Sequence, residues 1–328
     1  MNTIIGNPIT FGGGGLELVA NVADGATVTA TLGSKTVTGV SSGGQARLKI
    51  PQEGKWTVSA VKGTTASAQQ EVIVPATIDI AFQELNDASW TKIKQISDAG
   101  NGANFWSVGD CKEITMNGKA SNGLTLSNYS AWVYIIGFNH NAAREGNGIA
   151  FQGFKATKNG TPVCLTDSGY GTEQKSGTWF NMNNAQTNSG GWQESLMRKN
   201  VMPLIKAAFP SDLKAVIKPS TIFTTQGSGN GACTATEDEV FLLAEYEVFG
   251  TKRSASTQEP NYLKQYAYYA AGNSKKKYKH NATGATAGWW ERSPYSGAIY
   301  YFCYVNTGGN SSYINASYSY GVSPCFKV

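Results

Sequence analysis

The stretch that decides the fold of this 328-residue chain begins with Trp289-Trp290-Glu291-Arg292-Ser293-Pro294 and continues with Ile299-Tyr300-Tyr301-Phe302-Cys303-Tyr304-Val305. Aromatic and β-branched residues dominate the second run, which predicts a β-strand. Because successive side chains of a strand point to opposite faces, residues 299, 301, 303 and 305 share one face and residues 300, 302 and 304 share the other. Both faces carry aromatic rings, so we expect one of them to be exposed or to meet a partner.

The segment around this strand is rich in tyrosine and has no charge. Residues 295–320 contain seven of the 16 tyrosines of the chain, and serine, glycine and asparagine fill most of the other positions. This is the composition of antibody binding loops, in which tyrosine supplies rigid contact area and small polar residues adapt their hydrogen bonds. We therefore predict a ligand-binding surface here. Its candidate residues are Tyr295, Ser296, Tyr300, Tyr301, Tyr304, Asn306, Ser312, Tyr313, Asn315, Ser317, Tyr318 and Ser319.

Two other interpretations of the same composition stay open. Tyrosine is common in strands and serine in turns, so a plain β-rich terminus would contain many of these residues. Retroelement mutagenesis, which replaces adenines, can convert an Asn codon of the type AAY into Tyr, Ser, Thr or Asp codons, among others. Residues 300, 304, 306, 312, 313, 315, 317 and 319 all fall within the resulting set. The segment is thus a candidate for diversification.

The first quarter of the chain has a different pattern. After a lead-in over residues 1–12 and a run of four glycines at 12–15, apolar residues alternate with polar ones from Leu16 to Val74. Six or seven short strands separated by glycine-containing turns, without a helical pattern, are typical of a small all-β sandwich of immunoglobulin type. We expect this domain to cover residues 1–83.

The pattern changes after Pro75. Ser89 precedes Trp90, Ile93 and Ile96 at helical spacing, and Gly100 follows, which predicts a short capped helix. We expect a second domain of the α+β class over residues 84–328. Its further helices are expected within 193–209 and 262–271, and its strands at 113–116, 131–138, 148–151, 240–243 and 299–305.

Several segments of the second domain together carry a resemblance. They are Ile96-Ser97-Asp98-Ala99-Gly100, Trp106-Ser107-Val108-Gly109-Asp110, Ile135-Ile136-Gly137-Phe138-Asn139-His140, Gly191-Trp192, Tyr266-Ala267-Tyr268-Tyr269-Ala270, the paired tryptophans at 289–290 and Gly321-Val322-Ser323-Pro324-Cys325-Phe326. Residues 86–328 resemble a domain of unknown function that is abundant in prophage-encoded and tail-associated proteins of gut Firmicutes. The resemblance implies a C-type-lectin-like fold, similar to the variable proteins diversified by retroelements and to phage receptor-binding tips. An immunoglobulin-like module in front is common on phage tail proteins.

The resemblance implies a non-enzymatic display protein of a phage tail or virion. Its expected partner is a protein or glycan receptor on a bacterial cell surface, with other tail or virion proteins and further copies of the chain as additional partners. We expect synthesis in the bacterial cytoplasm without a signal peptide, because residues 1–6 do not pair a basic segment with an apolar one. Trp106, Trp132, Trp192 and Trp289 are expected to form the scaffold, and Arg292 to pair inside it.

Composition argues against most other classes. The net charge of +5 is too small and too scattered for a nucleic-acid binder, and the cluster from Lys275 to Lys279 is expected to be a solvated turn. No apolar run approaches the length of a membrane span. Five separated cysteines and two histidines supply metal or acid–base chemistry poorly. We therefore expect no metal, no cofactor and no catalytic residue: His140 is interpreted as a loop histidine and residues 237–239 as a solvated acidic turn.

Three alternatives are kept. Glu259-Pro260-Asn261 matches a sugar-binding signature of calcium-dependent lectins, but Trp290-Glu291-Arg292 stands where that site needs Trp-Asn-Asp. An enzyme of the formylglycine-generating class would need Cys303 and Cys325 to meet in space. A structural tail or capsid component would pack the tyrosine-rich surface against sister subunits.

Overall fold

The computed structural model describes residues 15–63, 65–80, 82 and 84–328, and the chain divides into two compact units. The N-terminal unit comprises residues 1–84 with 104–106, and the C-terminal unit comprises 85–103 with 107–328. The predicted lead-in and the first three glycines of the glycine run lie outside the described residues. Within the described part of the chain, no helix has the length and apolar character needed to cross a membrane.

Short strands make up the N-terminal unit. They form one sheet in the order β4-β1-β8 and a second in the order β3-β2-β5-β6, in which β7 also pairs with β5. The strands are β1 (Leu16–Asn21), β2 (Thr27–Leu32), β3 (Lys35–Val40), β4 (Gln45–Ile50), β5 (Lys55–Lys62), β6 (Thr65–Ala66), β7 (Gln70–Ile73) and β8 (Ala76–Asp79). The predicted all-β character of this part of the chain is confirmed.

The alternating pattern places one apolar core between these two sheets. Leu18 of β1, Leu48 of β4 and Trp56 of β5 are all at most 1% exposed and belong to one hydrophobic cluster. Because a strand turns every second side chain inward, the intervening threonines, lysines and glutamates face water. The period-two pattern therefore predicted the core of this unit residue by residue.

The C-terminal unit is mostly β-structure with short helices, which confirms the α+β class. Its strands are β9 (Cys111–Ser121), β10 (Leu124–Phe138), β11 (Ile149–Lys155), β12 (Val163–Cys164), β13 (Ser220–Gly227), β14 (Asn230–Asp238), β15 (Lys277–Lys279), β16 (Ala282–Ala287), β17 (Trp289–Pro294), β18 (Tyr301–Val305), β19 (Ser311–Asn315) and β20 (Cys325–Lys327). Its helices are η1 (Leu85–Asp87), α1 (Trp90–Asp98), η2 (Gly102–Asn104), α2 (Ala142–Glu145), α3 (Gly191–Glu194), η3 (Met197–Val201), α4 (Met202–Ala208), α5 (Ser211–Lys214), α6 (Glu245–Phe249) and α7 (Ala267–Ala270).

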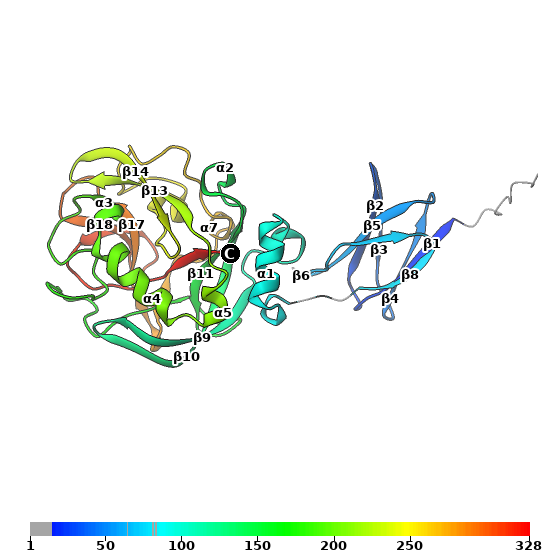
Figure 1. Ribbon diagram of the computed structural model, residues 1–328, viewed down its shortest axis with the longest axis horizontal. Coiled ribbons are helices and arrows are strands. Elements are labelled where there is room, and N and C mark those ends of the chain that lie inside the picture. Colours follow the sequence, from blue (N-terminus) through cyan, green and yellow to red (C-terminus); the bar gives the residue numbers. More distant parts are fainter. Residues whose placement is uncertain (1–14, 64, 81, 83) are drawn as a thin grey trace, which may run out of the picture. The chain divides into compact units, whose positions relative to one another are not determined.

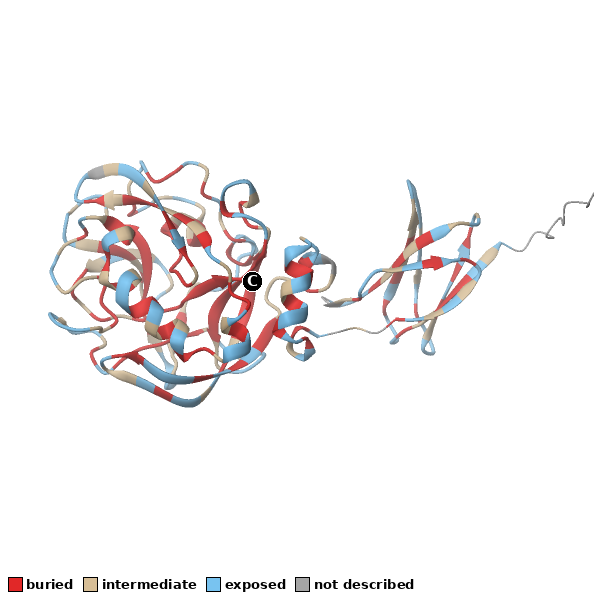
Figure 2. Cartoon of the chain, viewed as in Figure 1, coloured by how far each residue is buried: buried red, intermediate tan, exposed pale blue. Residues whose placement is uncertain are grey.

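An antiparallel sheet in the order β20-β11-β10-β9 is the frame of this unit, and β20 lies beside β11 (Figure 1). The last residue, Val328, exchanges two backbone hydrogen bonds with Ile149, of 3.1 and 3.2 Å. β20 is buried along its whole length, and all of β11 but its last residue is buried as well (Figure 2). The carboxyl end of the chain is therefore part of the core of the unit.

The helix predictions are right at α1 and partly wrong elsewhere. The side chain of Ser89 caps α1 by accepting the N–H of Lys92 at 3.2 Å. The predicted helix over 193–209 is divided into α3, the π-helical turn η3 and α4, with Pro203 in the first turn of α4, where proline is tolerated. Of residues 262–271 only α7 is helical. Residues 240–243 do not form the predicted strand, and Phe241 makes an isolated bridge with Cys325.

Candidate ligand-binding surface

The candidate residues lie mainly on the antiparallel sheet β17-β18-β19 and on the loop between its first two strands. In this sheet Cys303 pairs with Tyr313, and Tyr301 pairs with Asn315. Residues directly opposite each other point to the same face, so Tyr301 and Tyr313 share a face. The pairing therefore brings together two parts of the tyrosine-rich segment that are separate in the sequence.

Four tyrosines form one cluster on and beside this face. The rings of Tyr295 and Tyr313 are stacked with centroids 3.8 Å apart. The ring of Tyr301 lies 5.5 Å from that of Tyr313, and the ring of Tyr300 lies 6.2 Å from that of Tyr301. We name Tyr295, Tyr300, Tyr301 and Tyr313 the tyrosine cluster.

Part of the tyrosine cluster is open to solvent together with a neighbouring isoleucine. Tyr300 is 47% exposed, Tyr313 is 43% exposed and Ile299 is 46% exposed. In the described part of the C-terminal unit these are the exposed large apolar side chains. An apolar surface gathered at one place is typical of an interaction site, whereas isolated exposed apolar residues are common everywhere.

A buried asparagine holds the loop that carries Ile299 and Tyr300. The side-chain amide of Asn188 donates hydrogen bonds to the carbonyl oxygens of Tyr295 (3.1 Å), Ala298 (3.1 Å) and Tyr301 (2.8 Å). Its backbone N–H donates to the carbonyl of Ile299 at 2.7 Å. Each of these bonds fixes a different point of the loop, so the exposed side chains are presented on an ordered backbone. Sequence reasoning missed Asn188, because a lone asparagine gives no signal of contacts 107 to 113 residues away.

Tyr304 and Ser312 belong to the other face of the sheet. They pair with each other across β18 and β19, one position along from Cys303 and Tyr313. The ring of Tyr304 lies 5.2 Å from that of Tyr320 and 6.2 Å from that of Trp290, and it is half-buried. The expectation that Tyr304 and Tyr313 share one exposed patch is therefore wrong, because the period of two separates them.

Ser317 and Ser319 are not surface residues, and their assignment to the binding surface is wrong. Both are 0% exposed. The hydroxyl of Ser319 donates to the carboxylate of Asp167 at 2.6 Å, and the hydroxyl of Ser317 donates to Glu173 at 3.0 Å. Asp167 also accepts the N–H of Phe180 at 2.8 Å. These serines tie the last loop of the chain to the segment 167–180.

The remaining candidate residues are divided between the surface and the turn. Ser296 is exposed, and Asn315 and Tyr318 are half-buried. The side-chain oxygen of Asn306 accepts the N–H of Gly308 at 2.9 Å and that of Asn310 at 3.1 Å, which closes the turn between β18 and β19. Asn306 therefore has a structural role in the loop.

A buried ion pair joins β17 of this sheet to α6. Arg292 donates to Glu247 through both terminal nitrogens, at 2.6 and 2.5 Å, and Arg292 is 0% exposed. Arg292 also donates to the carbonyl of Leu242 at 2.8 Å. The prediction that Arg292 pairs inside the domain is confirmed. A two-pronged guanidinium–carboxylate contact fixes the orientation of both side chains.

Glu245 connects this interior to the edge of the binding surface. Its carboxylate accepts the backbone N–H groups of Arg253 (2.9 Å), Ser254 (3.0 Å) and Ala255 (2.8 Å). It also accepts the hydroxyl of Ser311 in β19. Ala255 forms a backbone bridge with Tyr295. The carboxylate thus holds the strand that carries Tyr313 and the segment beside Tyr295 in one arrangement.

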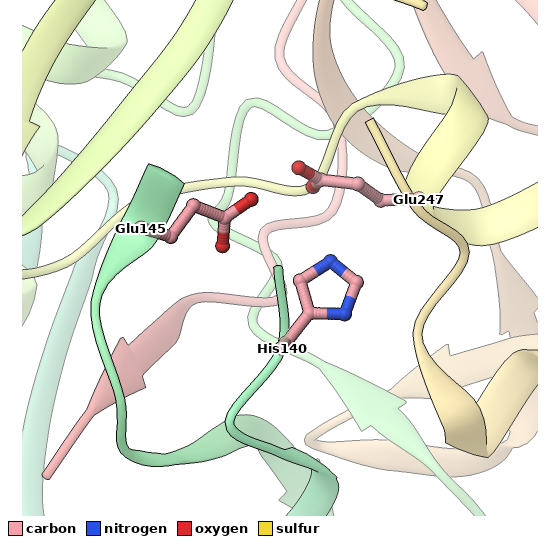
Figure 3. Close-up of side chains that lie close together, drawn as sticks. All are labelled: His140, Glu145 and Glu247. Carbon is pink, nitrogen blue, oxygen red and sulfur yellow. The ribbon is translucent and has the colours of Figure 1, made fainter. Parts of the chain in front are cut away.

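His140 is buried beside Glu145 and Glu247, and the three side chains converge (Figure 3). One potential ligand atom from each residue lies within 4.8 Å of the others. However, Glu145 is paired with Lys327 at 2.8 Å and Glu247 with Arg292, so a divalent cation would meet two buried positive charges. Burial lowers the pKa of His140 to about 4, which keeps the ring neutral. The cluster is best described as an ion-pair network joining α2, α6, β17 and β20.

Two charged groups that the sequence placed in solvent are buried. Asp238, in the predicted solvated turn, accepts hydrogen bonds from the indole of Trp192 at 2.8 Å and from Arg198 at 2.7 Å. Lys277, in the predicted solvated lysine cluster, is 1% exposed and donates to the hydroxyl of Tyr134 at 2.6 Å. Burial lowers the pKa of Lys277 to about 8. Both expectations failed because long-range packing covers these residues.

Of the predicted scaffold tryptophans, Trp132 is only half-buried and the other three are buried.

The residues of the two chemical alternatives are also buried. Glu259 is 1% exposed and Glu291 is 0% exposed, and burial raises the pKa of Glu259 to about 7 and that of Glu291 well above its usual range. Carboxyl groups that hold protons are poor ligands for calcium.

The two cysteines of the formylglycine-generating alternative, Cys303 and Cys325, are free thiols in different sheets, and burial raises the pKa of both.

The comparisons with known proteins found a match for only part of the C-terminal unit. No curated protein and no solved structure matches the chain. Residues 172–328, which include the tyrosine cluster, Asn188 and the Arg292–Glu247 pair, match the family described as "Domain of unknown function (DUF6273)".

Proposed function

We propose that the C-terminal unit is a non-enzymatic recognition domain that binds its ligand through the tyrosine cluster and Ile299. The observation that carries this proposal is the exposure of Ile299, Tyr300 and Tyr313 on a loop and strand that buried groups hold in place. No residue from 295 to 320 is charged. Removing water from such a surface is cheap compared with removing it from charged groups.

The physical properties of the tyrosine cluster suit recognition. Tyrosine is enriched among the interface residues that contribute most to affinity, because its ring is large and loses little rotational freedom on binding. The hydrogen bonds from Asn188 fix the loop before a ligand arrives, which reduces the entropy lost on association. An ordered scaffold that presents exposed side chains also suits diversification of the tyrosine-rich segment.

We propose further that the C-terminal unit has a C-type-lectin-like fold and that the N-terminal unit is an immunoglobulin-like spacer. In this account the chain belongs to a phage tail or virion and attaches it to a receptor on a bacterial cell. The arrangement of a small all-β unit before an α+β unit supports this account.

The experiment uses the labelled full-length chain and a panel of bacterial strains. After a binding strain is found, hydroxyl-radical footprinting of the bound and free chain reports which side chains the ligand covers. We expect protection of residues 295–301 and of Tyr313. Protection confined to another face, such as that of α4, or self-association with no cell binding, would contradict the proposal.

A further inference from the structure

A small cavity lies beside Tyr295, at the edge of the tyrosine cluster. It has a volume of about 80 Å³ and is lined by Thr225, Gly227, Gly229, Ser256, Tyr295 and Ser296, among others. Gly227 and Thr225 are buried, whereas Gly229 and Ser296 are exposed. A methyl group added at Gly229 would meet nothing within 4 Å. The cavity therefore has a buried floor and opens to solvent at one side.

Thr225, one of the residues that line the cavity, has a buried hydroxyl group whose hydrogen-bonding capacity is unused. Thr225 is 1% exposed, and among the residues that the structure describes its side-chain oxygen has no hydrogen-bond partner. Buried hydroxyl groups almost always have a partner, because leaving one unpaired is costly. A polar group of a ligand, or a water molecule in its place, fits this position.

The lining restricts the chemistry of such a ligand. The polar side chains around the cavity are hydroxyls of threonine, serine and tyrosine, and no lining residue is charged. A hydroxyl both donates and accepts hydrogen bonds, so it matches a ligand that is itself rich in hydroxyl or amide groups. A charged ligand group would lose its hydration here without gaining an opposite charge.

The size of the cavity restricts the ligand further. Pockets that enclose a whole small molecule usually have volumes of roughly 300–1,000 Å³, and a water molecule takes up about 30 Å³. A cavity of about 80 Å³ therefore holds a substituent of a few atoms. The rest of the ligand must lie outside, where the rings of Tyr295 and Tyr313 are stacked.

We propose that this cavity is a subsite for the exocyclic group of a neutral sugar, which the Thr225 hydroxyl binds while the sugar ring lies against the tyrosine cluster. The inference rests on the proposed function, and it narrows the receptor to a neutral glycan. The exocyclic group is a hydroxymethyl or an acetamido group, and the comparison of sugars below distinguishes them.

The first test uses three neutral trisaccharides and the full-length chain in titration calorimetry. Cellotriose and xylotriose differ only in the hydroxymethyl groups that xylose lacks, and the trimer of N-acetylglucosamine adds acetamido groups. We expect one of the two sugars with exocyclic groups to bind at least tenfold more tightly than xylotriose. Equal affinities for all three, or no binding to any at millimolar concentration, would overturn the proposal.

The second test uses variants of the cavity. Thr225→Val keeps the shape of the side chain and removes the hydroxyl, and we expect a three- to tenfold loss of sugar affinity, which is the range for one neutral hydrogen bond. Thr221→Val removes a hydroxyl four residues earlier in β13, where it donates to Glu237, and should leave the affinity unchanged. Ser256→Leu fills the cavity and should abolish binding. Unchanged affinity in Thr225→Val contradicts the subsite.

The two proposals can fail separately. If Tyr300→Ala abolishes cell binding while Thr225→Val and Ser256→Leu leave it unchanged, the surface recognises its receptor and the sugar subsite is wrong. If Tyr300→Ala also leaves cell binding unchanged, the proposed function is wrong. The trisaccharide comparison on the unmodified chain does not depend on the folding of any variant.

Discussion

The side-chain amide of Asn188 donates a hydrogen bond to the carbonyl oxygen of Tyr301, 2.8 Å away, across 113 residues of sequence. The same amide holds the carbonyls of Tyr295 and Ala298. One buried group thus sets the shape of the loop that presents Ile299 and Tyr300. The surface is exposed, but the groups that determine its geometry are in the interior.

Asn188→Ala removes these donors and leaves three loop carbonyls without them. We expect the free energy of unfolding to fall by about 1–3 kcal/mol, the cost of unpaired buried polar groups. Amide hydrogen exchange in residues 295–301 should become faster than in the unmodified chain. Gln186→Ala, which removes an exposed amide bound to Glu173, is the matched control and should change neither quantity. Unchanged exchange in Asn188→Ala would show that the loop is ordered by other contacts.

The Arg292–Glu247 pair is expected to be critical for the stability of the C-terminal unit. Because both side chains are buried, Arg292→Met leaves the carboxylate of Glu247 without its partner and should lower the free energy of unfolding by about 3–5 kcal/mol. The double variant Arg292→Met with Glu247→Gln should recover part of this loss in urea denaturation. If Glu247→Gln lowers the free energy of unfolding of the Arg292→Met variant by as much as it lowers that of the unmodified chain, the two residues do not act as a pair.

Glu259 should make the stability of the unit depend on pH. Burial raises its pKa from 4.5 to about 7, so between these values the folded chain holds a proton that the unfolded chain has released. The contribution of Glu259 to the free energy of unfolding is therefore fully present below pH 4.5 and is lost as the pH rises toward 7, by about 3 kcal/mol. His140, whose pKa is lowered to about 4, acts in the opposite direction.

The contribution of Glu259 is measured as the difference between the unmodified chain and Glu259→Gln, because His140 is present in both. We expect Glu259→Gln to become relatively more stable as the pH rises from 4.5 to 7. A difference that is independent of pH would show that the carboxyl group of Glu259 is not forced to hold its proton in the folded chain.

Two serines from the same tyrosine-rich segment should respond differently to substitution. Ser319→Ala removes a buried donor to Asp167 and should cost about 1–3 kcal/mol of unfolding free energy. Ser296→Ala changes an exposed residue and should stay within about 0.5 kcal/mol. Denaturant titrations of both variants check this. Equal effects would contradict the assignment of Ser319 to the scaffold.

The sequence predicted correctly those structural features that depend on residues close together in the chain. The core of the N-terminal unit follows from a period of two, and the cap of α1 from Ser89, because both are properties of neighbouring residues. The exposure of Tyr300 and Tyr313 agrees with the composition of their segment. These features needed no knowledge of distant contacts.

The rest of the site depends on pairing between distant residues. Ser317 and Ser319 look like loop residues, but the segment 167–180 covers them and accepts their hydroxyls. Lys277 and Asp238 are likewise buried among residues distant in the sequence, where they bond to Tyr134 and Trp192. The separation of Tyr304 from Tyr313 follows from the register of β18 and β19, which a single sequence does not reveal. Composition located the surface, and long-range pairing decided which residues belong to it.

The central claim is that the tyrosine cluster binds the receptor, and the double variant Tyr300→Ala with Tyr313→Ala tests it most directly. The measurement is the affinity of the variant for cells of a binding strain, taken together with its urea denaturation. Ile73→Ala, which alters a 73% exposed residue of the N-terminal unit, is the control. We expect an unfolding free energy within roughly 1–2 kcal/mol of the unmodified chain and a loss of cell binding of at least a hundredfold. A folded double variant that binds cells as tightly as the control would contradict the claim.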